Sequence, residues 1–412
     1  MLEMVDVLDV EVCQKHDSTL SRDEIEQTVR EELNLLVEVD LNIPIVGEKC
    51  TDNILKSHVI SIVCTCNHAE KNQITVANAE VRVYVYRLEQ EDGAIETMQN
   101  DSEEVPVSSH WILPAQEFYG LWENLYYDSD IQENLLHFVE TMMVYSDRRV
   151  NPNIINCNRV VLLHGPPGTG KTSMCRALAQ KIAIRLGDRY SRGELVEINS
   201  HSLFSKWFSE SGKLVMKLFG EIRALLEDPR ALVCVLIDEV ESLAHARKSS
   251  LSGTEPSDSI RVVNALLTQL DQLKRYPNVL ILTTSNVTEA IDLAFVDRAD
   301  INQFIGHPQE QAIYKIYHSC LRELMRTDFI EYEMLHSMSY LKKYGYEENP
   351  ETKKSLQLLE LSRQSVGLSG RTLRKIPFLA HALYLHAKKS SLHRFLRAMH
   401  FAIERQREIG AE

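Results

Sequence analysis

The sequence has no long apolar run. No stretch reaches the 18 or more apolar residues that a membrane-spanning helix requires. The first residues, Met1 to Asp6, are acidic and lack the basic and apolar pattern of a signal peptide. The eight cysteines are scattered, and free thiols are the expectation for such a chain. These absences predict a cytosolic or nuclear protein that does not enter the membrane.

An excess of positive charge is also lacking. Residues 1–106 hold 23 acidic and 8 basic side chains, whereas the rest of the chain is close to neutral. Direct nucleic-acid binding is therefore not expected, because phosphate contacts require clustered Lys and Arg. The acidity of the N-terminal quarter has two interpretations, which are general solubility and an acidic face for a basic protein partner.

The chain divides into four predicted parts. Residues 1–90 show a helical period and then an alternating strand pattern, which predicts an α+β domain. Residues 91–110 are polar and acidic and are interpreted as a linker. Residues 111–309 alternate strands with helices, as in a doubly wound parallel sheet. Residues 310–412 are mostly helical, so the predicted fold class is α/β with a C-terminal helical lid and a separate N-terminal domain.

A glycine-rich loop between a predicted strand and a predicted helix is the most informative motif. Backbone N–H groups of such a loop close around phosphate oxygens, and the helix N-terminus adds the positive end of its dipole. Lys171 is expected to reach the β- and γ-phosphates, and Thr172 to ligate Mg²⁺. The expected nucleotide-binding residues are Gly165, Pro166, Pro167, Gly168, Thr169, Gly170, Lys171, Thr172 and the adjoining Ser173.

Two further predicted strands end in polar side chains. Residues 232–237 are all apolar, as in a buried parallel strand, and Asp238 and Glu239 follow them. Asp238 is expected to hold Mg²⁺, and Glu239 to orient or deprotonate the attacking water. The strand at 279–284 leads to Asn286, whose amide is a candidate for hydrogen bonding to that water or to the γ-phosphate.

These segments resemble the Walker A, Walker B and sensor 1 elements of AAA+ ATPases. Residues 292–300 resemble the segment with the arginine finger, and Arg298 stands where one such arginine belongs. Many relatives have a second arginine where this chain has Phe295. Gly367–Arg371 resembles sensor 2, which implies that Arg371 lies near the nucleotide of its own subunit. The resemblance implies ATP and Mg²⁺ as cofactors. It also implies a homo-hexameric ring, because Arg298 would serve a neighbouring subunit.

Residues 201–213 take the place of the AAA+ pore loop. This segment, with 253–258 and 367–375, resembles the pachytene-checkpoint (thyroid-receptor-interacting protein) AAA+ family. The resemblance implies that Trp207 and Phe208 grip a substrate peptide. It implies an ATP-driven remodeller of HORMA-domain proteins that works with a HORMA-fold adaptor in meiotic chromosome regulation and spindle checkpoint control.

The same resemblance implies a location in nucleus and cytoplasm, on chromosomes and kinetochores. Residues 1–90 are then the expected site of substrate and adaptor recognition. Two alternatives remain open. One is an AAA+ ATPase of the clamp-loader or replication type that acts on DNA. The other is a nucleotide-gated scaffold without turnover.

Overall fold

The chain forms two compact units in the computed structural model, which describes residues 6–66, 73–100, 103–199, 211–241, 258–287 and 293–409. The first unit contains residues 1–122, 132–163 and 172–303, and the second contains residues 123–131, 164–171 and 304–412. Within the described ranges, no helix is long and apolar enough to cross a membrane.

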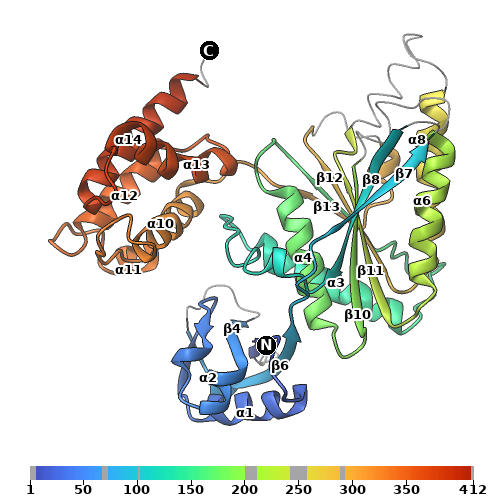
Figure 1. Cartoon of the computed structure of the whole chain (residues 1–412), viewed down its shortest axis with the longest axis horizontal. Coiled ribbons are helices and arrows are strands. Elements are labelled where there is room, and N and C mark those ends of the chain that lie inside the picture. The colour runs from blue at the N-terminus through green and yellow to red at the C-terminus, as the bar shows by residue number, and fades with distance from the viewer. Residues whose placement is uncertain are drawn as a thin grey trace. The chain divides into compact units, whose positions relative to one another are not determined.

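The N-terminal domain contains a four-stranded sheet, a two-stranded sheet formed by β2 and β5, and two α-helices (Figure 1). Its elements are β1 (Asp6–Gln14), α1 (Arg22–Asn34), β2 (Glu38–Asp40), β3 (Ile45–Val46), η1 (Gly47–Lys49), α2 (Asn53–His58), β4 (Val59–Cys66), β5 (Gln73–Thr75), η2 (Val76–Asn78) and β6 (Ala79–Arg87). The sheet order is β3-β4-β1-β6, in which β1 is antiparallel to β4 and parallel to β6.

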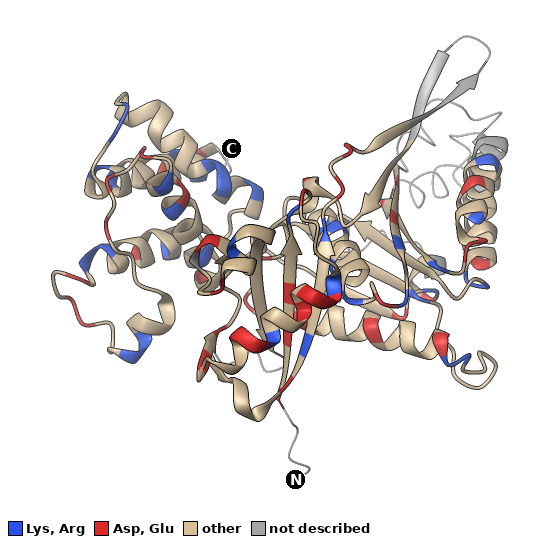
Figure 2. Cartoon of the chain, turned by 60° about the horizontal axis from the view of Figure 1, so that its bottom comes forward, with Lys and Arg blue, Asp and Glu red and all other residues tan. Residues whose placement is uncertain are grey.

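Helix α1 illustrates how the sequence specifies this domain. The Ser21 side chain accepts a hydrogen bond from the Glu24 N–H, and the Glu24 carboxylate accepts one from the Ser21 N–H, which together form a capping box. Ile25, Val29 and Leu33 recur every four residues and are buried. Acidic residues recur along the rest of the helix (Figure 2).

A seven-stranded sheet forms the centre of the large domain. The elements are β7 (Ala94–Asn100), β8 (Glu103–Leu113), η3 (Gln116–Phe118), α3 (Ile131–Asp147), β9 (Val160–His164), α4 (Lys171–Arg185), β10 (Arg192–Asn199), α6 (Ser211–Leu226), β11 (Ala231–Asp238), α8 (Asp258–Leu273), β12 (Val279–Ser285), α9 (Leu293–Val296) and β13 (Ile301–Phe304). The strand order is β13-β9-β12-β11-β10-β8-β7.

Helices cover both faces of this sheet. Buried side chains of α6 and α8 pack against one face of β9 to β12 in a single core cluster. Figure 1 shows α3 and α4 on the opposite side of the sheet from α6 and α8. Neighbouring strands β10, β11 and β12 are parallel, whereas β8 is antiparallel to β10. The predicted α/β class is confirmed, with a sheet that is mixed and mostly parallel.

The interpretation of residues 91–110 as a linker is wrong. Strands β7 and β8 pair with each other, and β8 extends the main sheet by pairing with β10. Trp111 is buried, and Gly93 lies so close that a Cβ there would be 2.2 Å from the indole nitrogen. The acidic composition hid these strands, because a hairpin at a sheet edge tolerates charged residues.

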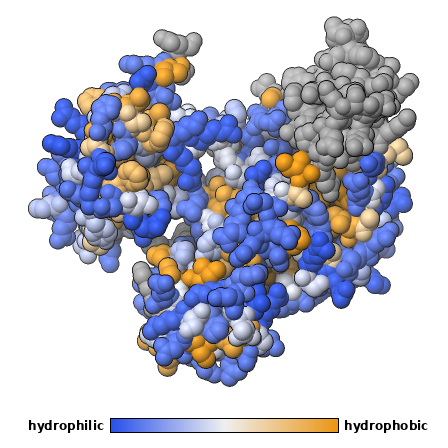
Figure 3. Space-filling model, in the orientation of Figure 1, coloured by the Kyte–Doolittle hydropathy of each residue, from blue (hydrophilic) through white to orange (hydrophobic). Residues whose placement is uncertain are grey.

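The C-terminal lid is helical, as predicted. Its elements are α10 (Glu310–Arg326), α11 (Met338–Lys343), α12 (Lys353–Gln364), α13 (Gly370–Ala380), the π-helical turn η4 (His381–Leu385) and α14 (Leu392–Ile409). Tyr314, Tyr317 and Phe395 are its largest fully buried side chains. Pro377 lies inside α13, and the helix changes to the π-helical turn at residue 381. Figure 3 shows apolar residues exposed on this unit.

Candidate nucleotide site

The glycine loop has backbone conformations and close contacts that residues with a side chain would not tolerate. Gly165, Gly168 and Gly170 have φ values of +142°, +76° and +93°, which glycine adopts without steric cost. A Cβ on Gly165 would lie 2.1 Å from the carbonyl oxygen of Ile305. The loop therefore keeps its backbone bare, which is what a phosphate-binding loop requires so that its N–H groups can approach an anion.

Side chains of the glycine loop itself hold its shape. Lys171 is buried, and its Nζ donates to the carbonyl oxygens of Gly165 and Pro166, each at 2.8 Å. The Thr169 hydroxyl also donates to the Pro166 oxygen, at 3.0 Å. Pro167 is exposed at the loop tip. Because α4 begins at Lys171, the helix N-terminus directly follows the loop.

Thr172 and Asp238 come together from two different elements. The Thr172 hydroxyl, on the first turn of α4, donates to Asp238 Oδ1 at 2.9 Å. The Thr284 hydroxyl, at the end of β12, donates to the same carboxylate oxygen. Ser173 follows Thr172 on α4 and is partly buried. Hydroxyl and carboxylate oxygens are the ligands that Mg²⁺ prefers, so the donor set fits the ion that the sequence predicts here.

Glu239 and Asn286 also meet. Asn286 Nδ2 donates to Glu239 Oε1 at 3.3 Å, and the Glu239 N–H donates to Thr284 Oγ1 at 3.2 Å. Glu239 has a φ of +59°, an unusual conformation for a residue with a side chain. Such strained positions cluster at functional sites. The end of β11 thus presents the Asp238 carboxylate to Thr172, and the next residue, Glu239, presents its carboxylate to Asn286.

Arg298 binds an acidic residue of its own unit. Its Nε and Nη2 lie 3.0 Å and 2.8 Å from the two carboxylate oxygens of Asp271 on α8. These hydrogen bonds from Arg298 are the main cause that lowers the pKa of Asp271. Phe295, which stands where relatives have a second arginine, is buried in the core of the large domain. Phe295 therefore has a packing role.

Arg371 lies beside the glycine loop. Its backbone N–H donates to the Gly168 carbonyl oxygen at 3.0 Å, and its side chain is exposed. Ser369 caps α13 by accepting a hydrogen bond from the Thr372 N–H. A Cβ on Gly168 would lie 3.0 Å from the Ser369 hydroxyl, so the start of α13 packs directly against the loop.

Tyr127 and Asp128 lie just ahead of the core, and the sequence did not predict their contacts. The Tyr127 hydroxyl lies 3.2 Å from the position of a Cβ on Gly170. The Asp128 carboxylate accepts hydrogen bonds from the N–H groups of Gln309 and Ala312 at the start of α10. Their partners are distant in sequence, so no local pattern could reveal these contacts. The predicted pore-loop residues Trp207 and Phe208 lie outside the described residues.

Comparisons with known proteins agree along the whole chain. The family "TRIP13 N-terminal domain" matches residues 4–91, "ATPase family associated with various cellular activities (AAA)" matches 161–307, and "TRIP13-like, AAA+ ATPase lid C-terminal domain" matches 309–407. Pachytene checkpoint protein 2 homolog of Gallus gallus is 52% identical over 407 residues, which cover 97% of this chain and 93% of that protein. The chain belongs to the pachytene checkpoint protein 2 family. It is therefore an AAA+ ATPase.

Other members of the pachytene checkpoint protein 2 family give the same result. The Homo sapiens homolog is 51% identical, and the aligned region covers 97% of this chain and 93% of that protein. The solved structure of C. elegans PCH-2 has a TM-score of 0.79 at 33% identity and covers 98% of this chain and 99% of that chain. The "Structure of E. coli MS115-1 HORMA:CdnC:Trip13 complex" contains a chain with a TM-score of 0.52 at 19% identity. The aligned region covers 71% of this chain and 94% of that chain. At this low identity, the likeness shows the fold alone.

Proposed function

We propose that this chain is the subunit of an ATP-driven homo-hexameric ring that partially unfolds HORMA-domain proteins with the help of a HORMA-fold adaptor. Membership of the pachytene checkpoint protein 2 family supports this proposal, as does the solved complex whose title names HORMA and Trip13 together. The proposed setting is meiotic chromosome regulation and spindle checkpoint control, in nucleus and cytoplasm and on chromosomes and kinetochores. The observation that carries the catalytic part is the meeting of Thr172 with Asp238 and of Glu239 with Asn286.

The loop residues Gly165 to Lys171 would hold the phosphates of ATP through backbone N–H groups and the Lys171 ammonium. Thr172 and Asp238 would hold Mg²⁺, with Ser173 beside them. When bound, Mg²⁺ neutralises charge on the β- and γ-phosphate oxygens. Lys171 Nζ donates to carbonyl oxygens of its own loop, so its positive charge lies at the loop that would bind the phosphates.

Glu239 would act as the base that takes a proton from the attacking water. Asn286 restrains the Glu239 carboxylate through its amide hydrogen bond, which limits the positions that the base can take. Arg371, at the start of α13, would contact the nucleotide of its own subunit. Arg298 would act on the nucleotide of the neighbouring subunit, since its fork geometry suits phosphate oxygens.

The mechanical step is assigned to Trp207 and Phe208. Large aromatic side chains on a polar loop can hold an extended peptide with little sequence preference. Partial unfolding suffices for such a machine, because opening one segment of a domain costs less than unfolding the whole. The N-terminal domain is the proposed receptor for substrate and adaptor.

Phosphate release and remodelling, measured on the same preparations, test this proposal. Glu239→Gln should bind ATP and lose steady-state phosphate release. Trp207→Ala should keep basal phosphate release and lose remodelling of a HORMA protein presented with its adaptor. Glu360→Gln, on the exposed surface of α12, is the matched control and should behave as wild type.

Four results would count against it. Phosphate release that persists in the Glu239→Gln variant would remove Glu239 from the base role. Remodelling that survives in Trp207→Ala would contradict the pore-loop assignment. Tight, salt-dependent DNA binding would favour the clamp-loader alternative, and absence of phosphate release from the wild-type chain would favour the scaffold alternative.

A further inference from the structure

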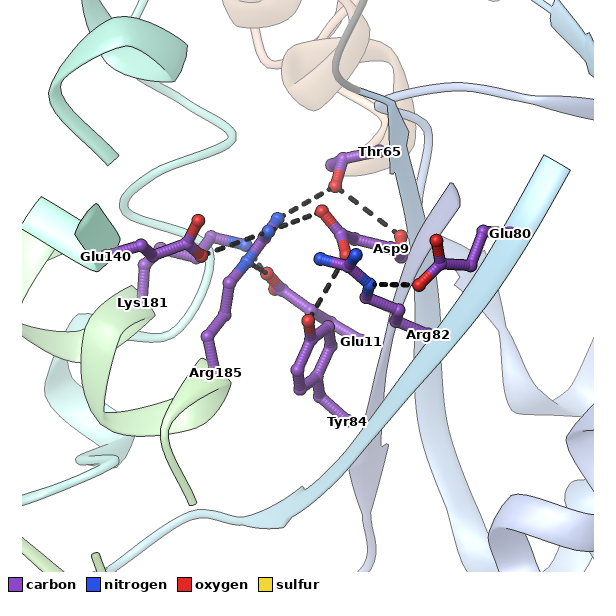
Figure 4. A network of polar contacts seen from close by, with 9 residues as sticks. All are labelled: Asp9, Glu11, Thr65, Glu80, Arg82, Tyr84, Glu140, Lys181 and Arg185. Atoms are coloured by element: carbon purple, nitrogen blue, oxygen red, sulfur yellow. Dashed lines mark hydrogen bonds and ion pairs between the residues drawn. The ribbon is translucent and has the colours of Figure 1, made fainter. Parts of the chain in front are cut away.

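A cluster of buried charges joins the N-terminal domain to helix α4 (Figure 4). Arg185 forms an ion pair with Asp9, and its Nε lies 3.3 Å from Glu11 Oε1. Lys181, one turn earlier on α4, pairs with the other oxygen of Glu11. The side chains of Glu11, Lys181 and Arg185 are only 1%, 5% and 7% exposed. At this contact β1 supplies carboxylates and α4 supplies cations.

Further groups surround the Arg185 guanidinium. Its Nη2 donates to the Thr65 hydroxyl on β4 at 3.0 Å, and its Nη1 lies 3.3 Å from Glu140 on α3. Its central carbon is 5.5 Å from the centre of the Tyr84 ring on β6. The planar fork of arginine can satisfy several partners at fixed angles. Arg185 is therefore held by three strands of the N-terminal domain and by one helix of the large domain.

Apolar packing continues the same contact. Ile184, between the two cations in sequence, is buried in a small cluster with Cys13, Tyr86 and Leu88 of the N-terminal region. The desolvation of buried ion pairs offsets much of their attraction, so their net contribution to stability is small, whereas removing one partner is strongly destabilising. At this contact the apolar cluster supplies packing, and the ion pairs connect defined positions of α4 and β1.

The charge states match this geometry. Burial raises the pKa of Glu11, but the Lys181 and Arg185 cations more than offset that effect, so its pKa is lowered overall. Burial disfavours the charged form of Arg185, yet Glu11, Asp9 and Glu140 raise its pKa overall. These shifts favour the charged forms of Glu11 and Arg185, and moving the N-terminal domain away from α4 would separate these charges.

Helix α4 also carries part of the candidate nucleotide site. Thr172 on its first turn bonds to Asp238, and Arg185 is the last residue of the same helix. At 1.5 Å per residue the two positions are about 20 Å apart along the helix axis. A helix packed on a sheet transmits displacement, because close-packed interiors deform little.

We propose that Lys181 and Arg185 are positioning residues that couple the N-terminal domain to the nucleotide site through α4. The orientation of the N-terminal domain sets the position of α4 and so of Thr172. Nucleotide at Thr172, in turn, changes how firmly β1 is held, because coupling between two sites is reciprocal. This inference rests on the proposed role of Thr172 and its loop in binding nucleotide, and it is independent of which protein the N-terminal domain receives.

Hydrogen exchange of the full-length chain tests the coupling. The amides of β1, residues 6–14, are measured by mass spectrometry without nucleotide and with saturating ADP. In the wild type, ADP should change their exchange rates by about fivefold or more, the lower end of typical coupling. In Glu11→Gln, which keeps the side-chain shape and removes the charge, this ADP-dependent change should be lost while ADP still binds.

Two companion variants make the test decisive. Thr65→Val removes one hydrogen bond of Arg185 and keeps every charge, so it should reduce the ADP-dependent change even if Glu11→Gln fails to fold. Glu80→Gln breaks an exposed pair with Arg82 on the same domain and should leave the change intact. A purely structural cluster would lower the melting temperature in Glu11→Gln and leave the ADP-dependent difference unaltered.

The coupling is refuted if ADP leaves β1 exchange unchanged in the wild type, or if Glu11→Gln and Thr65→Val retain the full ADP-dependent change. A separate titration with a fluorescent ADP analogue distinguishes this failure from failure of the proposed site. Lys171→Ala should lose that binding if the loop is the nucleotide site, whatever β1 does.

Discussion

Replacing Gly165 by alanine tests the glycine loop with a single methyl group. Gly165 has a φ of +142°, and a Cβ there would lie 2.1 Å from the Ile305 carbonyl oxygen. Backbone conformations of this kind cost about 1–3 kcal/mol for a residue with a side chain. The clash adds to that strain, because a backbone oxygen cannot move aside as a flexible side chain can. The loop of Gly165→Ala should therefore relax into another shape.

That relaxation has a measurable effect on affinity. Binding of ATP must restore the loop, so the same 1–3 kcal/mol reappears as a loss of roughly 5–150-fold in nucleotide affinity. The assay is titration of the intact chain with a fluorescent ATP analogue, with thermal unfolding measured in parallel. Steady-state phosphate release at saturating ATP then shows whether the altered loop still supports turnover.

Gly220→Ala is the matched control. Gly220 lies inside α6, and the nearest atom to an added Cβ is a side-chain nitrogen of Arg223 at 3.9 Å, an ordinary contact. Alanine there should stabilise the chain by about 0.5–1 kcal/mol without changing nucleotide affinity. Wild-type affinity and melting temperature in Gly165→Ala would refute the reasoning from φ and from the Ile305 contact.

Three further predictions concern the contact of Thr172 with Asp238, the pair of Arg298 with Asp271, and Glu11 in the buried charge cluster. Thr172→Ala removes the hydroxyl that contacts Asp238 and should raise the Mg²⁺ concentration for half-maximal phosphate release by roughly 10–100-fold; an unchanged Mg²⁺ titration would exclude Thr172 as a ligand. Asp271→Asn should cost no more than about 1 kcal/mol in thermal unfolding, because its pair with Arg298 is partly exposed. Arg298→Ala should abolish phosphate release, because Arg298 is the proposed arginine finger of the proposed ring. Equal activity of both variants would contradict that proposal. The pKa of Glu11 is lowered from 4.5 in the folded state, so its contribution to stability is present above pH 4.5 and is lost as the pH falls through the lower folded value. The stability of Glu11→Gln, measured by acid unfolding, should lack this pH dependence. The same loss of stability with falling pH in the wild type and in Glu11→Gln would show that Glu11 is not responsible.

The nucleotide-site motifs could be found from sequence because each is local. A glycine loop, an apolar strand and the polar residues after it follow one another along the chain, and their spacing reports the chemistry directly. The pairing of Thr172 with Asp238 could be anticipated, because the carboxyl ends of the parallel strands in one sheet lie along the same edge. Thr172 follows β9 and Asp238 ends β11, and only β12 lies between these two strands. The predicted role of Trp207 and Phe208 stays a prediction, because these residues lie outside the described part of the chain.

Other features could not be predicted, since they depend on partners far apart in the sequence. Strands β7 and β8 were hidden in an acidic segment because composition does not show what a strand pairs with. The contact of Asp128 with the start of α10 joins residues 181 positions apart, counted to Gln309. The pair between Arg298 and Asp271 likewise depends on how α8 lies in the large domain.

The sequence by itself determined the family and the ATPase activity, and it singled out the candidate phosphate-binding residues, because a glycine loop and the ends of strands are encoded locally. Tertiary structure alone decided that the last turn of α4 is held by Asp9 and Glu11 of β1. Those residues are more than 150 positions from Lys181 and Arg185 in the chain. Folding brings them together because buried cations require carboxylate partners, and that requirement has no local signature in either segment.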